Sequence, residues 1–125
     1  MANNCYCGSG IAFSNCCEPF ILGSEFPSTA EKLMRSRYSA YCTHNAAYLI
    51  ATTHSSTRKN HHKEDILSFA LENHWVKLEI LTTSEKKVEF KAYYLDSNLK
   101  AHVHHEKSTF QNEEGRWFYV DGEWF

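Results

Sequence analysis

The spacing of hydrophobic residues changes twice along this 125-residue chain. Residues 1–27 show neither helical nor alternating apolar spacing long enough to form a buried face. From Ser28 to about residue 73, apolar residues recur every three or four positions, which predicts amphipathic helices. Beyond residue 73, apolar and polar residues alternate, which predicts strands with one buried face. This order, helices first and strands afterwards, predicts an α+β fold.

Local signals set the limits of the elements. Pro27 followed by Ser28-Thr29-Ala30-Glu31 is a capping-box pattern, so a helix is expected to start there. Three helices are predicted, at residues 28–42, 45–52 and 63–73, and the polar segment 53–62 is expected to be a loop. Four antiparallel strands are predicted, at residues 75–82, 87–95, 99–111 and 116–121. We expect the three helices to pack on one face of a curved four-stranded sheet.

The first predicted helix carries a charge inside its apolar stripe. At 100° per residue, Arg37 falls near the centre of the stripe, and Arg35 projects to its flank, towards solvent. The stripe itself consists of Ala30, Leu33, Met34 and Tyr41. An unpaired buried guanidinium would cost several kcal/mol. Arg37 is therefore expected either to form a buried ion pair with Glu89 or Glu106, or to bind an anionic group in a cavity.

The strands carry candidate chemistry of their own. His102, His104 and Glu106 share one face of the third strand, and His105 lies on the other face. Such a set could form a metal triad or perform acid/base catalysis, although imidazoles on a strand face are more often solvated. Glu106 is the first acid/base candidate and His105 accompanies it, ahead of Tyr119 and Asp121. In the first strand, alternation places Val76, Leu78 and Ile80 on one face and Trp75 on the other.

Composition adds one pronounced feature: four of the five cysteines fall within the first 17 residues. Cys5, Cys7, Cys16 and Cys17 have the spacing C-x-C-x(8)-C-C, and four thiolates this close can close a tetrahedral zinc site of the structural class. The alternative is a redox role, with the paired thiols cycling through disulfides. Cys42, beside the apolar stripe of the first helix, is expected to be a core residue.

Charge and segment composition exclude several partners. Thirteen Lys and Arg against fifteen Asp and Glu give a net charge of −2, so specific DNA binding is not expected. The start of the chain resembles no export signal, no apolar run is long enough for a membrane span, and a cytoplasmic location is expected. The basic run Arg58–Lys63 is either a solvated loop or a contact for RNA.

Two blocks of the chain resemble known families. The run Cys5-Tyr6-Cys7-Gly8-Ser9-Gly10, with Phe13 and Cys16-Cys17, resembles the SEC-C zinc-binding motif. The remainder resembles the YchJ family, in the segments Leu33–Tyr38, Tyr48-Leu49, Thr52–Arg58, Val88–Phe90, His105-Glu106, Gly115–Trp117 and Tyr119–Gly122. The resemblance implies a SEC-C motif at residues 1–27 and a nuclear-transport-factor-2-like domain, the cystatin-like cone, at residues 28–125. It also implies one structural Zn²⁺ and no established activity.

The function expected from these features is that of a zinc-binding interaction protein. The resemblance to SEC-C motifs, which look like docking modules, implies that the knuckle formed by the four cysteines docks a protein or ribosomal partner, such as the ribosome or a secretion chaperone. The cone would offer a second surface or a small-ligand pocket. Residues expected in that pocket are Arg37, Tyr41, Trp117 and Tyr119. The alternative is a small isomerase, dehydratase or hydrolase that uses Glu106 or His105 as acid/base and Arg37 as an anion anchor.

Overall fold

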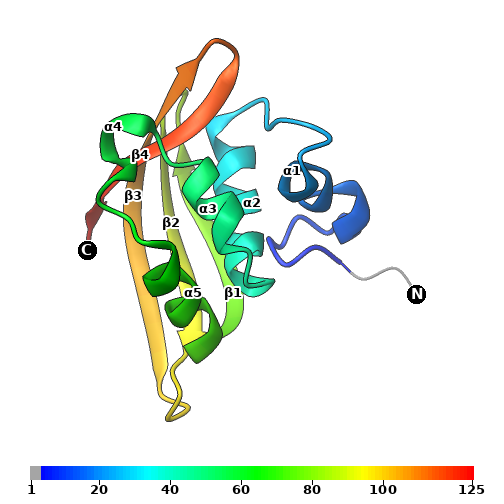
Figure 1. Ribbon diagram of the computed structural model, residues 1–125. Helices are drawn as coiled ribbons and strands as arrows, with labels where there is room; N and C mark the ends of the chain where they lie inside the picture. The colour runs from blue at the N-terminus through cyan, green and yellow to red at the C-terminus, as the bar shows by residue number, and fades with distance from the viewer. Residues whose placement is uncertain (1–3) are drawn as a thin grey trace.

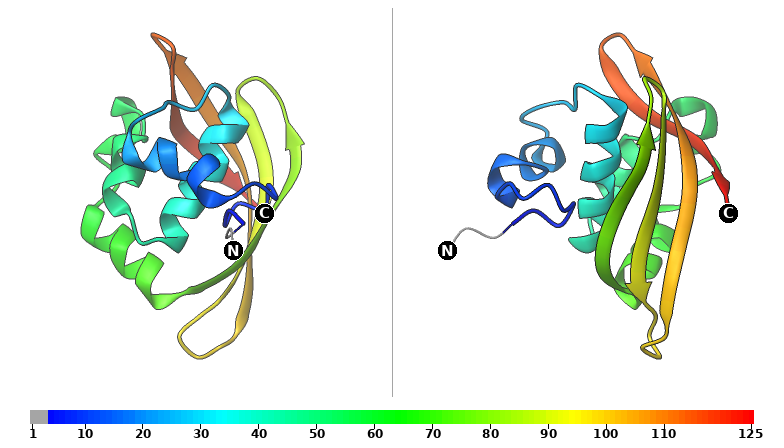
Figure 2. Two further views of the ribbon diagram at one scale, coloured as in Figure 1. Left: turned by 90° about the vertical axis from the view of Figure 1, so that its right-hand side faces the viewer. Right: turned by 180° about the vertical axis from the view of Figure 1, so that it is seen from behind.

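The structure is a computed structural model that describes residues 4–125. A single antiparallel sheet with the strand order β1-β2-β3-β4 carries helices α2, α3 and α5 on one side (Figures 1 and 2). The elements are η1 (Phe13–Asn15), α1 (Glu18–Leu22), α2 (Ala30–Cys42), α3 (Ala46–Ala51), α4 (Ser55–Arg58), α5 (Lys63–Glu72), β1 (His74–Thr83), β2 (Lys87–Leu95), β3 (Ala101–Glu113) and β4 (Arg116–Trp124). The predicted α+β class and the helices-then-meander order are confirmed.

Side-chain caps fix where the helices begin. Thr29 caps α2 and Asn45 caps α3, because each side chain accepts a hydrogen bond from the backbone N–H three residues further along. The segment 53–62, predicted to be a loop, contains the one-turn helix α4. His54 Nδ1 caps it by accepting a hydrogen bond from the Ser56 N–H at 3.1 Å. Histidine is not among the usual capping residues, so the sequence signal was absent.

The alternation of β2 is confirmed, but that of β1 is broken by a bulge. Val88, Phe90 and Ala92 of β2 are all buried. In β1 the register with β2 shifts between Trp75 and Lys77, which inserts an extra residue. As a result Trp75 turns towards the helices and Val76 is 58% exposed, so the prediction for these two residues is wrong.

The N-terminal cysteines share one core with the helices and the sheet. Cys5, Cys7 and Cys17 are buried in the same cluster as Leu33 and Leu49. Figure 2 shows the N-terminal segment lying against the side of α2 that faces away from the sheet. α2 is therefore the wall between the cysteine cluster and the sheet. Within residues 4–125, no helix is long and apolar enough to cross a bilayer.

Arg35 connects α2 to the cysteine segment instead of projecting freely into solvent. Its Nη1 donates a hydrogen bond to the Cys7 carbonyl oxygen at 2.7 Å, and its Nε donates to Glu31 at 2.9 Å. The Ser39 hydroxyl lies 3.5 Å from the Cys5 sulfur on the same side of the helix. The expectation of a solvated Arg35 is wrong, because the cysteine segment brings a backbone acceptor within its reach.

Candidate functional site

The four N-terminal cysteines converge on one point. Their sulfur atoms all lie within 4.8 Å of one another, and the Cys7–Cys16 and Cys16–Cys17 separations are 3.7 and 4.0 Å. Four sulfurs bonded to one tetrahedral metal at about 2.3 Å would stand about 3.8 Å apart. The two sulfur separations of 3.7 and 4.0 Å match this value, and the four cysteines together could hold a metal ion.

The thiols also favour a cation electrostatically. Hydrogen bonds from the Cys17 and Cys7 thiols lower the pKa of Cys5, whereas the contact with Cys5 raises the pKa of Cys17. Burial raises the pKa of Cys16. Coordination to a metal cation would favour the ionised form of the cysteine ligands. Cys42 lies outside this cluster, and burial raises its pKa to about 12, as fits the predicted core thiol.

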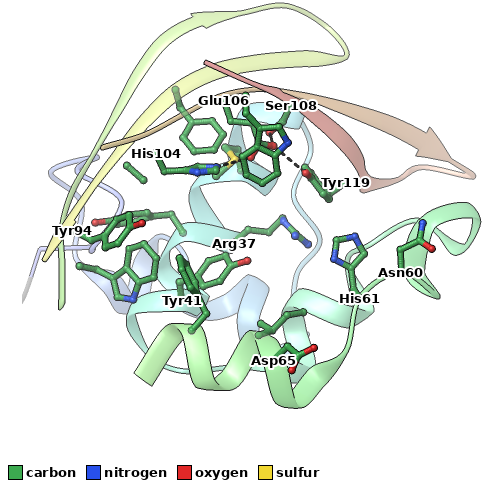
Figure 3. Close-up of a pocket in the computed structure, with 18 of the residues that line it drawn as sticks. Arg37, Tyr41, Asn60, His61, Asp65, Tyr94, His104, Glu106, Ser108 and Tyr119 are labelled. Atoms are coloured by element: carbon green, nitrogen blue, oxygen red, sulfur yellow. Dashed lines mark hydrogen bonds and ion pairs between the residues drawn. The ribbon is translucent and has the colours of Figure 1, made fainter. Parts of the chain in front are cut away.

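On the other side of α2, between that helix, α5 and the sheet, lies a cavity of about 540 Å³ (Figure 3). Arg37 and Tyr41 of α2 and Tyr119 of β4, three of the four residues predicted for a pocket, line it. The fourth, Trp117, lies outside this cavity. It lines a smaller one of about 370 Å³, and its indole N–H donates to the Ser28 carbonyl oxygen at 3.2 Å.

Arg37 is buried, and no carboxylate among residues 4–125 pairs with it. Its Nη1 donates to the Leu49 carbonyl oxygen at 2.9 Å and to Thr52 Oγ1 at 2.7 Å. The guanidinium carbon lies 4.5 Å from the centre of the Tyr119 ring. No ion pair joins Arg37 to an acidic residue within residues 4–125, so the prediction of a pair with Glu89 or Glu106 is wrong. Arg37 does line the cavity, as the alternative prediction of an anion-binding group requires, and that role stays a prediction.

Glu106 is occupied by other donors. Its Oε1 lies 2.7 Å from His104 Nε2, and its Oε2 accepts hydrogen bonds from Ser108 Oγ at 2.6 Å and the Tyr119 hydroxyl at 2.9 Å. Burial acts to raise the pKa of Glu106, but the hydrogen bonds from these three groups outweigh it, so the pKa is lowered. Glu106 is therefore an ionised acceptor at neutral pH, which does not suit the role of a general acid.

Of the two neighbouring histidines on β3, His104 lines the cavity and His105 does not. Because the Glu106 carboxylate can only accept, His104 carries a proton on Nε2 and donates it to Oε1. His105 lies on the opposite face of β3, where its Nε2 is 2.8 Å from Glu89. His105 therefore does not line the cavity in which the sequence predicted an acid/base role for it. The period-two pattern that grouped His104 with Glu106 already contained the signal.

Several cavity residues were not predicted for the site. Trp75 was assigned to the wrong face because of the bulge in β1. Asn60 and His61 belong to the basic run that was read as a solvated or RNA-binding loop, and they line the cavity. Burial and the nearby Arg37 lower the pKa of His61, so its imidazole is neutral at pH 7.

Gly122 of β4 provides the room that Glu106 needs. A Cβ atom on Gly122 would collide with the Glu106 carboxylate group. We predict that Gly122→Ala lowers the free energy of unfolding by about 1–3 kcal/mol, because the carboxylate must leave its three hydrogen bonds. Urea denaturation of the wild type, of each single variant and of the double variant with Glu106→Ala measures this. The cost of Gly122→Ala should shrink in the Glu106→Ala background. An equal cost in both backgrounds would mean that the two residues do not collide.

Comparisons with known proteins agree with this geometry. The family model described as the middle NTF2-like domain of YchJ matches residues 29–122, and the SEC-C motif matches residues 1–19. A UPF0225 protein from Photorhabdus laumondii is 40% identical over 129 residues, which cover 98% of this chain and 81% of that protein. A UPF0225 protein from Geobacter sulfurreducens is 38% identical, with 98% and 80% covered.

Solved structures give the same result. The solution structure of a SEC-C motif containing protein from Rhodopseudomonas palustris superposes with a TM-score of 0.91 at 34% identity, covering 97% of this chain and 98% of that one. The crystal structure of a SEC-C motif containing protein from Psychrobacter arcticus gives a TM-score of 0.77 at 26% identity, with 94% and 80% covered. The chain therefore belongs to the YchJ (UPF0225) family and carries a SEC-C motif ahead of its NTF2-like domain.

Proposed function

We propose that this protein is a zinc-stabilised binding protein whose cavity between α2, α5 and the sheet takes a small ligand. The observation that carries the proposal is the cavity itself, which holds the buried Arg37 cation with no acidic partner among residues 4–125. A volume of about 540 Å³ lies within the range of about 300–1,000 Å³ typical of small-molecule sites.

Binding fits this cavity better than catalysis. A general acid needs a carboxyl group whose pKa is raised, whereas the pKa of Glu106 is lowered by its hydrogen bonds. Burial and the neighbouring Glu106 raise the pKa of Tyr119, so its phenol remains a donor to that carboxylate. Both groups therefore hold one another in place, and neither is suited to give up a proton to a substrate at neutral pH.

A neutral aromatic probe tests whether the cavity accepts ligands. We expect 2-naphthamide to shift the indole N–H signal of Trp75, which lines the cavity, in ¹H–¹⁵N spectra of the labelled protein. The indole N–H of Trp117, which lies outside the cavity, should not move and serves as the internal control. The proposal fails if no cavity signal shifts, or if Trp117 shifts together with Trp75.

Zinc is the metal that the cysteine cluster fits best. Four thiolates with no open position are typical of structural zinc sites, and soft sulfur ligands in a tetrahedral arrangement favour zinc or iron–sulfur centres over hard cations. The Ser9 hydroxyl lies 3.2 Å from the Cys16 sulfur, where it would help to orient that ligand. Because η1 and α1 are only 3 and 5 residues long, the metal would supply much of the stability of this segment.

Metal content tests the zinc assignment. Protein purified without chelators is expected to contain one zinc ion per chain, measured by inductively coupled plasma mass spectrometry. The Cys16→Ser/Cys17→Ser variant should lose that zinc because half of the ligands are removed. Cys42→Ser, which changes the one cysteine outside the cluster, should keep it. Full zinc content in the double variant, or a different metal in the wild type, would contradict the assignment.

A second candidate function, docking of a protein or ribosomal partner, is favoured by the outer surface of the knuckle. Tyr6 and Ile11 belong to the cysteine segment and are each 50% exposed. Exposed apolar side chains on a segment held rigid by a metal are suited to a partner surface. Such a surface would leave the cavity on the far side of α2 accessible.

Sedimentation with purified ribosomes tests the ribosomal form of this candidate. The wild type is expected to sediment with them, and Tyr6→Ser/Ile11→Ser should reduce the bound fraction at least tenfold because the apolar contact is lost. Leu99→Ser, an exposed apolar change on the β2–β3 turn, is the matched control and should bind as the wild type does. Equal sedimentation of all three proteins would contradict docking through this surface.

A further inference from the structure

The cavity has an aromatic end. The rings of Phe69, Trp75 and Tyr94 lie 5.1 to 5.8 Å apart, centre to centre, and Tyr41 lies 5.3 Å from Trp75. All four line the cavity and none is fully buried. A planar apolar ligand would find ring faces and edges here to stack against, and it would cover surface that is now exposed to water.

A cation lies beside this aromatic end. Arg37 is the one Lys or Arg among the residues lining the cavity, and the His61 imidazole is neutral for the reasons given above. All the hydrogen bonds of the guanidinium to residues 4–125 come from Nη1, so Nε and Nη2 remain available. Glu106 does not compete for them, because its two oxygens accept from His104, Ser108 and Tyr119.

The two features are close enough for one small molecule to contact both. Arg37 and Tyr41 are one turn apart on α2, a spacing that places Cβ atoms about 5–6 Å apart. Figure 3 shows Tyr41 and Tyr94 on one side of the Arg37 guanidinium and His61 and Asn60 on the other. A group bound by Arg37 can thus carry a ring directly into the aromatic end.

We propose that the ligand of this cavity is a small aromatic monocarboxylate, whose carboxylate pairs with Nε and Nη2 of Arg37 and whose ring packs against Trp75 and Tyr94. The proposal rests on the ligand-binding function proposed above and names the chemical class of the ligand. Two adjacent guanidinium nitrogens match the two oxygens of a carboxylate in a bidentate pair. Because a buried charge is costly when it is unpaired, the low-dielectric cavity favours an anionic partner for Arg37.

The charges around the cavity select one negative charge over two. Asp65 and Glu106 line the same cavity as Arg37, so the permanent charges there are one positive and two negative. A carboxylate neutralises Arg37 with a single charge. A phosphate ester, which carries close to two charges at neutral pH, would leave one facing the acidic residues. Aromatic phosphates should therefore bind more weakly than carboxylates of the same shape.

Three probes with the same ring system test the proposal on the wild-type protein. Titrations of 2-naphthoate, 2-naphthamide and 2-naphthyl phosphate are followed through the Trp75 indole N–H and the Arg37 Nε–H, with Trp117 as the silent control. The expected result is that 2-naphthoate binds at least tenfold more tightly than the uncharged amide, and more tightly than the phosphate. Only 2-naphthoate should shift the Arg37 Nε–H strongly.

Two variants assign the charge preference to Arg37. Arg37→Gln removes the charge and is expected to weaken 2-naphthoate at least tenfold while leaving 2-naphthamide within about twofold. Lys32→Gln removes one positive charge from an exposed position on the same helix and should change neither affinity. Circular dichroism melting establishes that both variants are folded. If Arg37→Gln does not fold, the wild-type comparison among the three probes decides alone.

The outcomes separate the ligand class from the ligand-binding function. Equal affinity for 2-naphthoate and 2-naphthamide would overturn the carboxylate class and leave the cavity a binding site. Tighter binding of 2-naphthyl phosphate would overturn the preference for a monoanion. Failure of all three probes to shift the Trp75 signal would overturn both proposals. Retention of the charge preference in folded Arg37→Gln would remove Arg37 from the site.

Discussion

Burying the Arg37 guanidinium within the apolar stripe of α2 is the constraint that organises this domain. The charge is tolerated because Nη1 donates to Leu49 and Thr52, at the end of α3, and because Tyr119 covers the guanidinium. Those acceptors are themselves fixed, since the Tyr119 N–H donates to the Thr52 carbonyl oxygen at 2.8 Å, which ties the α3–α4 connection to β4. One buried cation thus connects α2, α3 and β4 at the wall of the cavity.

Helix α2 contributes side chains to two sites, one on each of its opposite sides. Arg35 and Ser39 of α2 contact the cysteine segment, whereas Arg37 and Tyr41 line the cavity. A metal in the cysteine cluster would therefore fix the outer side of α2 and, through the rigidity of a hydrogen-bonded helix, the position of the cavity wall. The cavity does not need the metal for its chemistry. It needs α2 to stay where the cysteine segment, α3 and the sheet hold it.

The sequence was sufficient wherever local periodicity and spacing decide the structure. The stripe on α2, the alternation of β2 and the four convergent cysteines follow from intervals along the chain, and all are present. It was insufficient where an irregularity changes the interval. The bulge between Trp75 and Lys77 reverses the two faces at the start of β1, and the residue types there do not predict a bulge. The cap of α4 by His54 was missed because that role is rare for histidine.

The hydrogen-bond partners of Arg37 could not be predicted from the sequence for a different reason. A carboxylate on a facing strand is the ordinary solution for a buried arginine, and Glu106 does lie on the wall of the same cavity. However, His104 and Ser108 each lie two residues from Glu106 on the same face of β3, and Tyr119 approaches from β4, so three donors already satisfy that carboxylate. Gly122 leaves the space in which this network forms. Competition among donors, which depends on three-dimensional packing, therefore leaves two nitrogens of Arg37 without a hydrogen bond to residues 4–125, and an arginine without an acidic partner in that part of the chain is suited to receive one from a ligand.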